Sequence, residues 1–242
     1  METNVNLTFD EASHTYHADG VEMLSVSALL GLFTKQSLKN TTNERIKEKA
    51  RVNSEIAIEK GKAFHEIAAK VFQFVFFGSE VKNEGATEKM ISCFMDTLTF
   101  IRKAGEILDT GIETALCSPT FGVAGTPDLV IHYADHRTKI IDWKTNASLD
   151  PNNFGKSMEP PLDTLPDTSM AYYIMQLNLY AWLVSQNADV PIENISAHIV
   201  HVSGPHAPVI YQNCITPEKQ ALVAKLLEWK KLNENFIKKI NT

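Results

Sequence analysis

Apolar and polar positions repeat with two different periods along the chain, and the change of period divides it into parts. Residues from about 38 to 77 favour helix, with an interruption expected near Gly61. A second helix is predicted from about 87 to 103, where apolar side chains recur every third or fourth position, at Met90, Phe94, Leu98 and Ile101. The region before residue 105 is therefore expected to be rich in helix.

Shorter apolar segments with turn residues between them flank this helical region. Near the N-terminus, 5–10 and 14–18 predict a hairpin, and the hydroxyls of Ser25 and Ser27 are suited to capping a short helix. The later segments predict strands at 111–119, 122–133, 138–145, 196–203 and 208–215, and helices at 170–185 and 217–240. This order predicts an α/β fold with a central mixed β-sheet flanked by helices on both faces.

Length and composition fit one domain over 1–242, with 44% hydrophobic and 21% charged residues. We expect a helical region over about 34–105, a sheet core over about 107–215 and a C-terminal helix over 216–242. The longest mostly apolar stretch has about a dozen residues, fewer than the ~20 of a membrane span. No secretory signal is visible, so a cytoplasmic protein without membrane association is expected.

The net charge of −6 argues against nonspecific coating of nucleic acid, although two segments are locally basic. Residues 35–62 hold eight Lys or Arg against four Glu, and residues 225–239 hold five Lys against two Glu. Either segment could be a solvated helix face or a surface that binds phosphate. Charge alone therefore leaves both interpretations open.

The segments 125–130 and 139–145 carry the candidate chemistry. If they form a hairpin with its tip at 134–136, facing residues have numbers that sum to 270, so Asp128 faces Asp142. Side chains alternate along a strand, which puts Asp142 and Lys144 on one face. The pattern therefore predicts two carboxylates and an ammonium group close together.

Opposed carboxylates destabilise a sheet unless a cation offsets their repulsion. Oxygen ligands suit Mg²⁺ or Mn²⁺, and Lys144 beside such an ion would orient an attacking water or hold a phosphate oxygen. The alternative is an ion pair of Lys144 with Asp128 and Asp142 that serves stability alone. The hairpin by itself leaves these two readings about equal.

The same residues resemble the PD-(D/E)XK nuclease superfamily, in particular its RecB-like exonuclease branch. Four segments match motifs of that branch in order: a G-x-x-x-H motif at 61–65, a G-x-x-D strand at 124–128, a D-x-K-T strand at 142–145 and a Q-x-x-x-Y helix at 176–180. The opening at 14–27 is similar to phage-encoded exonucleases and to the mitochondrial genome maintenance exonuclease. The resemblance runs from about residue 5 to 184.

The resemblance implies a role for each matching residue. Asp128 and Asp142 would bind one or two Mg²⁺ or Mn²⁺ ions, with His65 and the backbone carbonyl of Trp143 as further ligands, and Lys144 would be the catalytic lysine. Gln176 and Tyr180 would contact DNA or hold that lysine, or else simply pack in the core. Glu113 would bind metal through water, or be an edge-strand charge.

The resemblance also implies a DNA exonuclease that acts on single-stranded ends in recombination or replication and is phage-encoded. A helical arch with a basic channel would guide the strand, and its candidate DNA contacts are Lys35, Lys39, Arg45, Lys47, Lys49, Arg51, Lys60 and Lys62. Two alternatives are a structure-selective endonuclease of the resolvase or flap type and a catalytically silent DNA-binding protein.

Missing motifs narrow the expected cofactors and partners. Three scattered cysteines do not supply the four that an iron–sulfur cluster needs, so no such cluster is expected. The sequence contains no P-loop motif, so no nucleotide cofactor is expected either. We therefore expect a nuclease without its own motor, which could work with a helicase, a single-strand-binding protein or a recombination protein.

Overall fold

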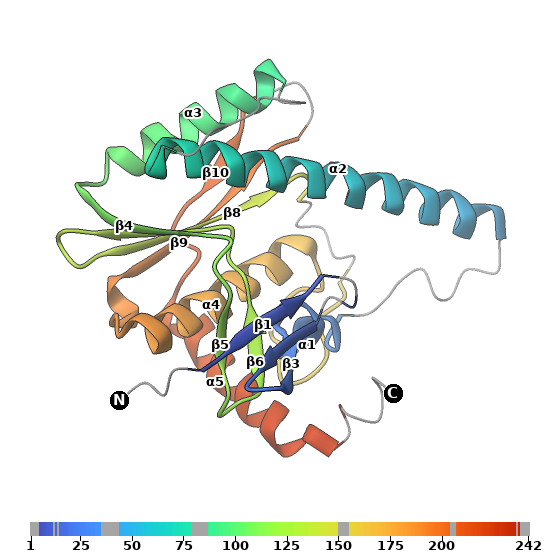
Figure 1. The fold of residues 1–242 in the computed structure, drawn as a ribbon. Helices are drawn as coiled ribbons and strands as arrows, with labels where there is room; N and C mark the ends of the chain where they lie inside the picture. The colour runs from blue at the N-terminus through green and yellow to red at the C-terminus, as the bar shows by residue number, and fades with distance from the viewer. Residues whose placement is uncertain are drawn as a thin grey trace.

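A computed structural model describes residues 5–11, 13, 15–34, 44–78, 87–149, 155–203, 207–235 and 237, with backbone only for 44–54. Within these residues ten strands form two five-stranded sheets (Figure 1). None of the helices described has the length and apolar character that crossing a bilayer requires.

The central sheet has the strand order β10-β9-β8-β7-β4. Its strands are β4 (Ile107–Ile112), β7 (Leu129–Tyr133), β8 (Thr138–Lys144), β9 (Ile195–His201) and β10 (Val209–Tyr211). β8 and β9 are parallel, and the chain passes between them through α4 (Ser169–Ala188). The other neighbours pair antiparallel, so the sheet is mixed.

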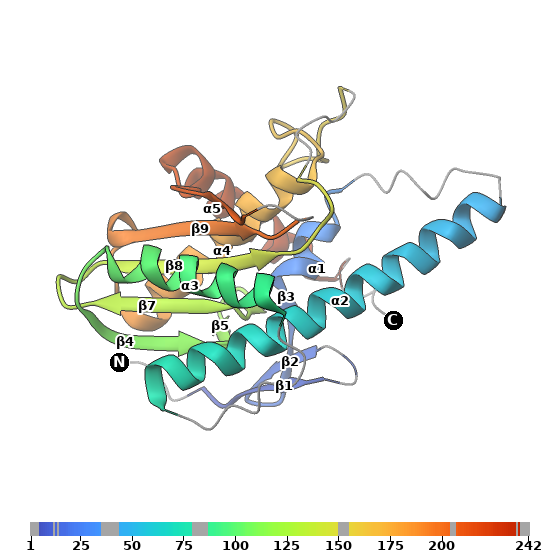
Figure 2. The same ribbon diagram turned by 90° about the horizontal axis from the view of Figure 1, so that it is seen from above.

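Helices cover both faces of this sheet, as expected. The long α2 (Glu44–Phe77) and α3 (Glu88–Arg102) lie across one face, and α4 and α5 (Pro217–Leu232) cover the other (Figures 1 and 2). Trp143 of β8 packs against Phe72 and Phe94 on the first face. On the second face, Ile140 packs with the apolar side of α4. β8 is thus buried on both faces, which fixes its register.

A second, smaller sheet has the strand order β1-β2-β3-β6-β5. Its strands are β1 (Leu7–Asp10), β2 (Thr15–Ala18), β3 (Val21–Ser25), β5 (Leu116–Ser118) and β6 (Val123–Gly125). β3 pairs parallel with β6 and leads into α1 (Val26–Gly31), whose N-cap Ser25 accepts a hydrogen bond from Ala28 N. A short 3₁₀ helix (Ile192–Asn194) precedes β9.

The predicted fold class is confirmed, with two corrections. The interruption near Gly61 is wrong because α2 continues through it, and glycine there costs only about 1 kcal/mol relative to alanine. A Cβ at Gly61 would lie 3.3 Å from Thr145 Oγ1, so the glycine lets α2 approach the end of β8. The expectation of one sheet was also incomplete, because segments 111–119 and 122–133 each divide between the two sheets.

Candidate active site

The hairpin of β7 and β8 has the register that the sequence predicts. Leu129 pairs with Ile141 and Ile131 with Lys139, so the numbers sum to 270 as expected. Asp128 lies one residue before β7, in the turn that connects it to β6. The ladder ends at the pair of Leu129 and Ile141, so Asp128 and Asp142 lie just beyond it, close enough for the charge of Asp128 to raise the pKa of Asp142.

Asp128 connects three segments of the site. Its Oδ2 accepts a hydrogen bond from the backbone N–H of Trp143 at 2.7 Å. Its Oδ1 lies 3.0 Å from Nδ1 of His65, which reaches the site from α2. Its backbone carbonyl accepts a hydrogen bond from the N–H of Glu113. Asp128 is therefore buried and held from both sides, with β8 on one and α2 on the other.

The ring of His65 is tuned by its carboxylate neighbours. Burial lowers the pKa of His65, but the charge and hydrogen bond of Asp128 outweigh burial and raise that pKa to about 9. Phe64, one position earlier, is buried against Phe94 and fixes this part of α2 on α3. The helix thus presents the imidazole to the sheet from a packed position.

Glu113 follows β4 in the left-handed backbone region, with φ of 47°. Burial of its carboxyl group, and then the charge of Asp128, raise the pKa of Glu113 to about 7. One ligand atom each from His65, Glu113 and Asp128 lie within 4.8 Å of one another. Imidazole nitrogen and carboxylate oxygen are suitable donors for a divalent cation, so these three residues could hold one.

Asp142 and Lys144 form a buried ion pair beside this cluster, with Nζ 2.5 Å from Oδ2. Asp142 is only 2% exposed, and burial raises its pKa to about 6 although Lys144 lowers it. Burial lowers the pKa of Lys144, but Asp142 and Asp128 raise it above its ordinary value. Asp142 Oδ2 has no well-oriented hydrogen bond from any described residue. A buried carboxylate oxygen whose nearest partner is an ammonium group could also be a ligand of a metal ion.

Gln176 and Tyr180 lie on one face of α4, as predicted. The side-chain carbonyl of Gln176 accepts a hydrogen bond from Lys144 Nζ at 2.9 Å. Its Nε2 donates to Ser27 Oγ at 3.1 Å and to Tyr180 OH at 3.2 Å. Gln176 therefore links the lysine of the central sheet to α1 and to the next turn of α4.

Several contacts that complete these surroundings have no signal in the sequence. Ser27 was expected as a helix cap and as the end of the opening segment that resembles phage-encoded exonucleases, but its contact with Gln176 was not predicted. The ring of Tyr173 lies 4.5 Å from Lys144 Nζ, and Tyr173 OH donates to Asn146 Oδ1. Both depend on how α1, α4 and the segment after β8 pack together, which periodicity does not reveal.

The basic residues expected to contact DNA are only partly within the structure. Lys35 and Lys39 lie outside the described residues. Arg45, Lys47, Lys49 and Arg51 lie on α2, where only the backbone is described. Lys60 and Lys62 are exposed on α2, within two turns of His65. The N-terminal half of α2 extends beyond both sheets (Figure 1).

A family model of the PD-(D/E)XK nuclease superfamily matches residues 85–241, which include the hairpin carboxylates, Lys144 and Gln176. The chain belongs to the PD-(D/E)XK nuclease superfamily. Membership confirms the resemblance that the motifs indicated, at the level of the superfamily. His65 lies outside the matched part, and the structure brings it to the site through its contact with Asp128, as the motif at 61–65 led us to expect.

Solved structures similar to this member of the PD-(D/E)XK nuclease superfamily include a candidate exonuclease from Eubacterium rectale, at 18% identity and a TM-score of 0.43. That alignment covers 75% of this chain and 65% of the other, so this chain spans less than two thirds of it. The structure of SSO0001 is similar at 16% identity and a TM-score of 0.30, covering 69% and 74% of the two chains. A search of curated proteins finds no match.

Proposed function

We propose that the protein is a metal-dependent DNA exonuclease that hydrolyses phosphodiester bonds at single-stranded ends. The observation that supports this most strongly is the cluster of His65, Glu113 and Asp128 beside the buried pair of Asp142 and Lys144. Superfamily membership makes DNA the expected substrate. We further propose a phage-encoded enzyme of the host cytoplasm, acting in recombination or replication with a helicase, single-strand-binding or recombination protein.

His65, Asp128 and Asp142 would hold Mg²⁺ or Mn²⁺, with Glu113 binding directly or through water and the Trp143 carbonyl as a further ligand. A bound ion of this kind lowers the pKa of a coordinated water and neutralises phosphate charge. Lys144 would orient the attacking water and contact a phosphate oxygen. Gln176 and Tyr180 would keep the ammonium group of Lys144 in position, since Gln176 contacts both.

A digestion assay tests the proposal. Linear and covalently closed circular single strands of one sequence, both labelled, are incubated with the protein and Mg²⁺ or Mn²⁺, and parallel samples contain EDTA. We expect the linear strand to be degraded from an end, the circle to survive, and EDTA to stop the reaction.

Each other result points to a different function. Degradation of both strands at similar rates would favour a structure-selective endonuclease. DNA binding without cleavage in any metal would favour a silent DNA-binding protein on the same fold. An Asp142→Ala variant separates binding from hydrolysis, because we expect it to lose turnover and still bind DNA.

A further inference from the structure

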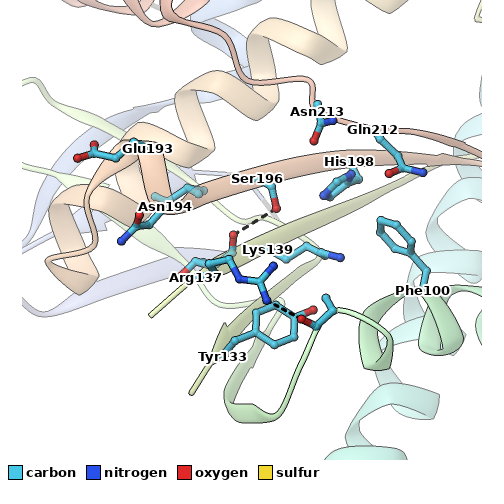
Figure 3. Close-up of a pocket in the computed structure, with 13 residues that line it drawn as sticks. Phe100, Tyr133, Arg137, Lys139, Glu193, Asn194, Ser196, His198, Gln212 and Asn213 are labelled. Atoms are coloured by element: carbon cyan, nitrogen blue, oxygen red, sulfur yellow. Dashed lines mark hydrogen bonds between the residues drawn. The ribbon is translucent and has the colours of Figure 1, made fainter. Parts of the chain in front are cut away.

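A pocket of about 350 Å³ opens on the α3 side of the central sheet, away from the candidate active site (Figure 3). Lys139 of β8 and His198 of β9 line its floor, and Phe100 of α3 forms one wall. Lys139 and Lys144 are five positions apart on β8, which corresponds to about 16 Å along a strand. Lys139 also points to the opposite face of β8, so the pocket is separate from the nuclease cluster.

Lys139 is a buried cation that no described carboxylate neutralises. The residue is 7% exposed, and its ammonium group lies 3.8 Å from the centre of the Phe100 ring. Burial and the positive charge of Arg137 both lower the pKa of Lys139, and no acidic group in the described part of the chain opposes them. A cation–π contact recovers only part of the cost of burying a charge. The buried ammonium group of Lys139 therefore lacks a negatively charged partner among the described residues.

His198 is unpartnered in the same pocket. The residue is 3% exposed, and neither ring nitrogen has a hydrogen-bond partner among the described residues. Its ring lies 5.0 Å from that of Phe100, in an edge-to-face arrangement. Buried polar groups almost always have a partner, so a neutral imidazole with a free N–H here points to a ligand.

The rim adds donors from a different direction. Gln212 and Asn213, which follow β10, carry their amides over the floor (Figure 3). The guanidinium of Arg137 already donates hydrogen bonds to Asp135 and to the carbonyl of Ala104. It therefore adds positive electrostatic potential to the pocket and is not counted as a donor for a ligand. The acidic lining residue Glu193 lies on the far side of the opening from the Lys139 ammonium group (Figure 3).

We propose that this pocket binds a small phosphate-bearing ligand, with Lys139 as its anchor and His198, Gln212 and Asn213 as hydrogen-bond donors. A tetrahedral phosphate accepts hydrogen bonds from several directions, which matches donors on the floor and the rim, whereas a planar carboxylate would use fewer of them. The volume is large enough for inorganic phosphate or for a nucleoside monophosphate. The proposal does not depend on the nuclease activity.

Calorimetric titration tests the proposal, in a phosphate-free buffer with EDTA so that no metal-dependent site contributes. The probes are inorganic phosphate, thymidine 5′-monophosphate and succinate. We expect the wild type to bind at least one phosphate probe and to bind succinate at least tenfold more weakly. Stronger binding of the nucleotide would identify a nucleotide site, and equal binding a simple phosphate site; both support the proposal.

Variants locate the binding. Lys139→Met keeps the contact with Phe100 and removes the charge, and we expect it to weaken binding at least tenfold. Gln212→Ala, at the exposed rim, should weaken binding a few-fold without altering the fold. The matched control Lys225→Met, at an exposed position of α5, should bind as the wild type does. Lys144→Met, in the candidate active site, should keep the binding that Lys139→Met loses.

Three results would overturn the proposal. The first is no phosphate binding by the folded wild type, and the second is binding that survives both Lys139→Met and Gln212→Ala. The third is binding lost in Lys144→Met and kept in Lys139→Met, which would assign the phosphate to the candidate active site. Near-ultraviolet circular dichroism of each variant shows that the pocket is still folded.

Discussion

The ammonium group of Lys144 is held by a carboxylate, an amide oxygen and an aromatic ring, supplied by Asp142, Gln176 and Tyr173. We expect Lys144→Met to lower kcat about 10²–10⁴-fold, the range typical of a positioned proton-transfer group, and to leave metal affinity nearly unchanged. Single-turnover cleavage and metal titration measure the two effects. Lys139→Met is the matched control on the other face of β8 and should cleave normally. A decrease in kcat of less than tenfold would indicate that Lys144 serves only the stability of the protein, through its ion pair.

His198 gives the stability of the protein a pH dependence. Burial, and then the charge of Lys139, lower the pKa of His198 to about 4, from about 6.5 in an unfolded chain. Because the unfolded state takes up the proton first, stability is unaffected above pH 6.5 and falls as the pH drops from 6.5 to 4. At pH 5 the loss is about 2 kcal/mol, from a difference of about 1.5 pKa units.

Urea unfolding in phosphate-free buffer at pH 7 and pH 5 measures this loss. We expect His198→Gln, which cannot take up a proton, to lose about 2 kcal/mol less than the wild type between the two pH values. The comparison uses differences within each protein, so any constant cost of the substitution cancels. Equal losses in the two proteins would contradict the assignment to His198.

At the scale of elements, α4 approaches the end of β6 closely. A Cβ at Gly125 would lie 2.7 Å from Cε1 of Tyr180 and 3.0 Å from a methyl group of Val26. Gly125→Ala should therefore destabilise the protein by about 1–3 kcal/mol through overpacking, and lower cleavage by displacing Tyr180. The control Gly31→Ala meets no atom within 4 Å and should change thermal stability little. Equal melting temperatures for the two variants would contradict the close contact.

The predictable and unpredictable elements differ in the range of their contacts. The β7–β8 register followed from the alternation of side chains and a short turn, both local properties. The second sheet did not, because β3 and β6 pair although about a hundred residues separate them. Likewise the i, i+4 spacing placed Gln176 and Tyr180 together, but only the packing of α1 on α4 brings Ser27 to them. The predicted interruption at Gly61 was wrong because it rested only on the low helix propensity of glycine. The close approach of α2 to β8, which favours a glycine at this position, is a long-range contact.

At the scale of the whole molecule, the proposed function requires an acidic protein to attract DNA, which is also acidic. With a net charge of −6, DNA binding depends on local basic surface, and Lys60 and Lys62 are exposed beside the site. Replacing both by Gln should weaken single-strand binding and reduce the slope of log K against log salt by about 1.4, at about 0.7 per phosphate contact. Fluorescence anisotropy at several salt concentrations measures the slope.

The matched control replaces Lys225 and Lys231, which are exposed on α5 in the second basic segment. We expect this double variant to keep the wild-type slope. A reduced slope in the α5 variant, with no change in the α2 variant, would contradict this prediction. It would indicate that DNA binds on the α5 side of the sheet.

The hydrogen bond between Ser27 and Gln176 spans 149 positions of the chain, and that between His65 and Asp128 spans 63. Contacts so distant in sequence form late in folding, because the entropy cost of closing a long loop comes before the stabilisation that the contact provides. On a ribosome the N-terminal sheet, α2 and the hairpin emerge before α4 does. Lys144 then has no Gln176 to hold it, so under the proposed function a nascent chain that already displays both aspartates would still be inactive. Under that proposal, the order of synthesis would delay hydrolytic activity until most of the polypeptide has been made.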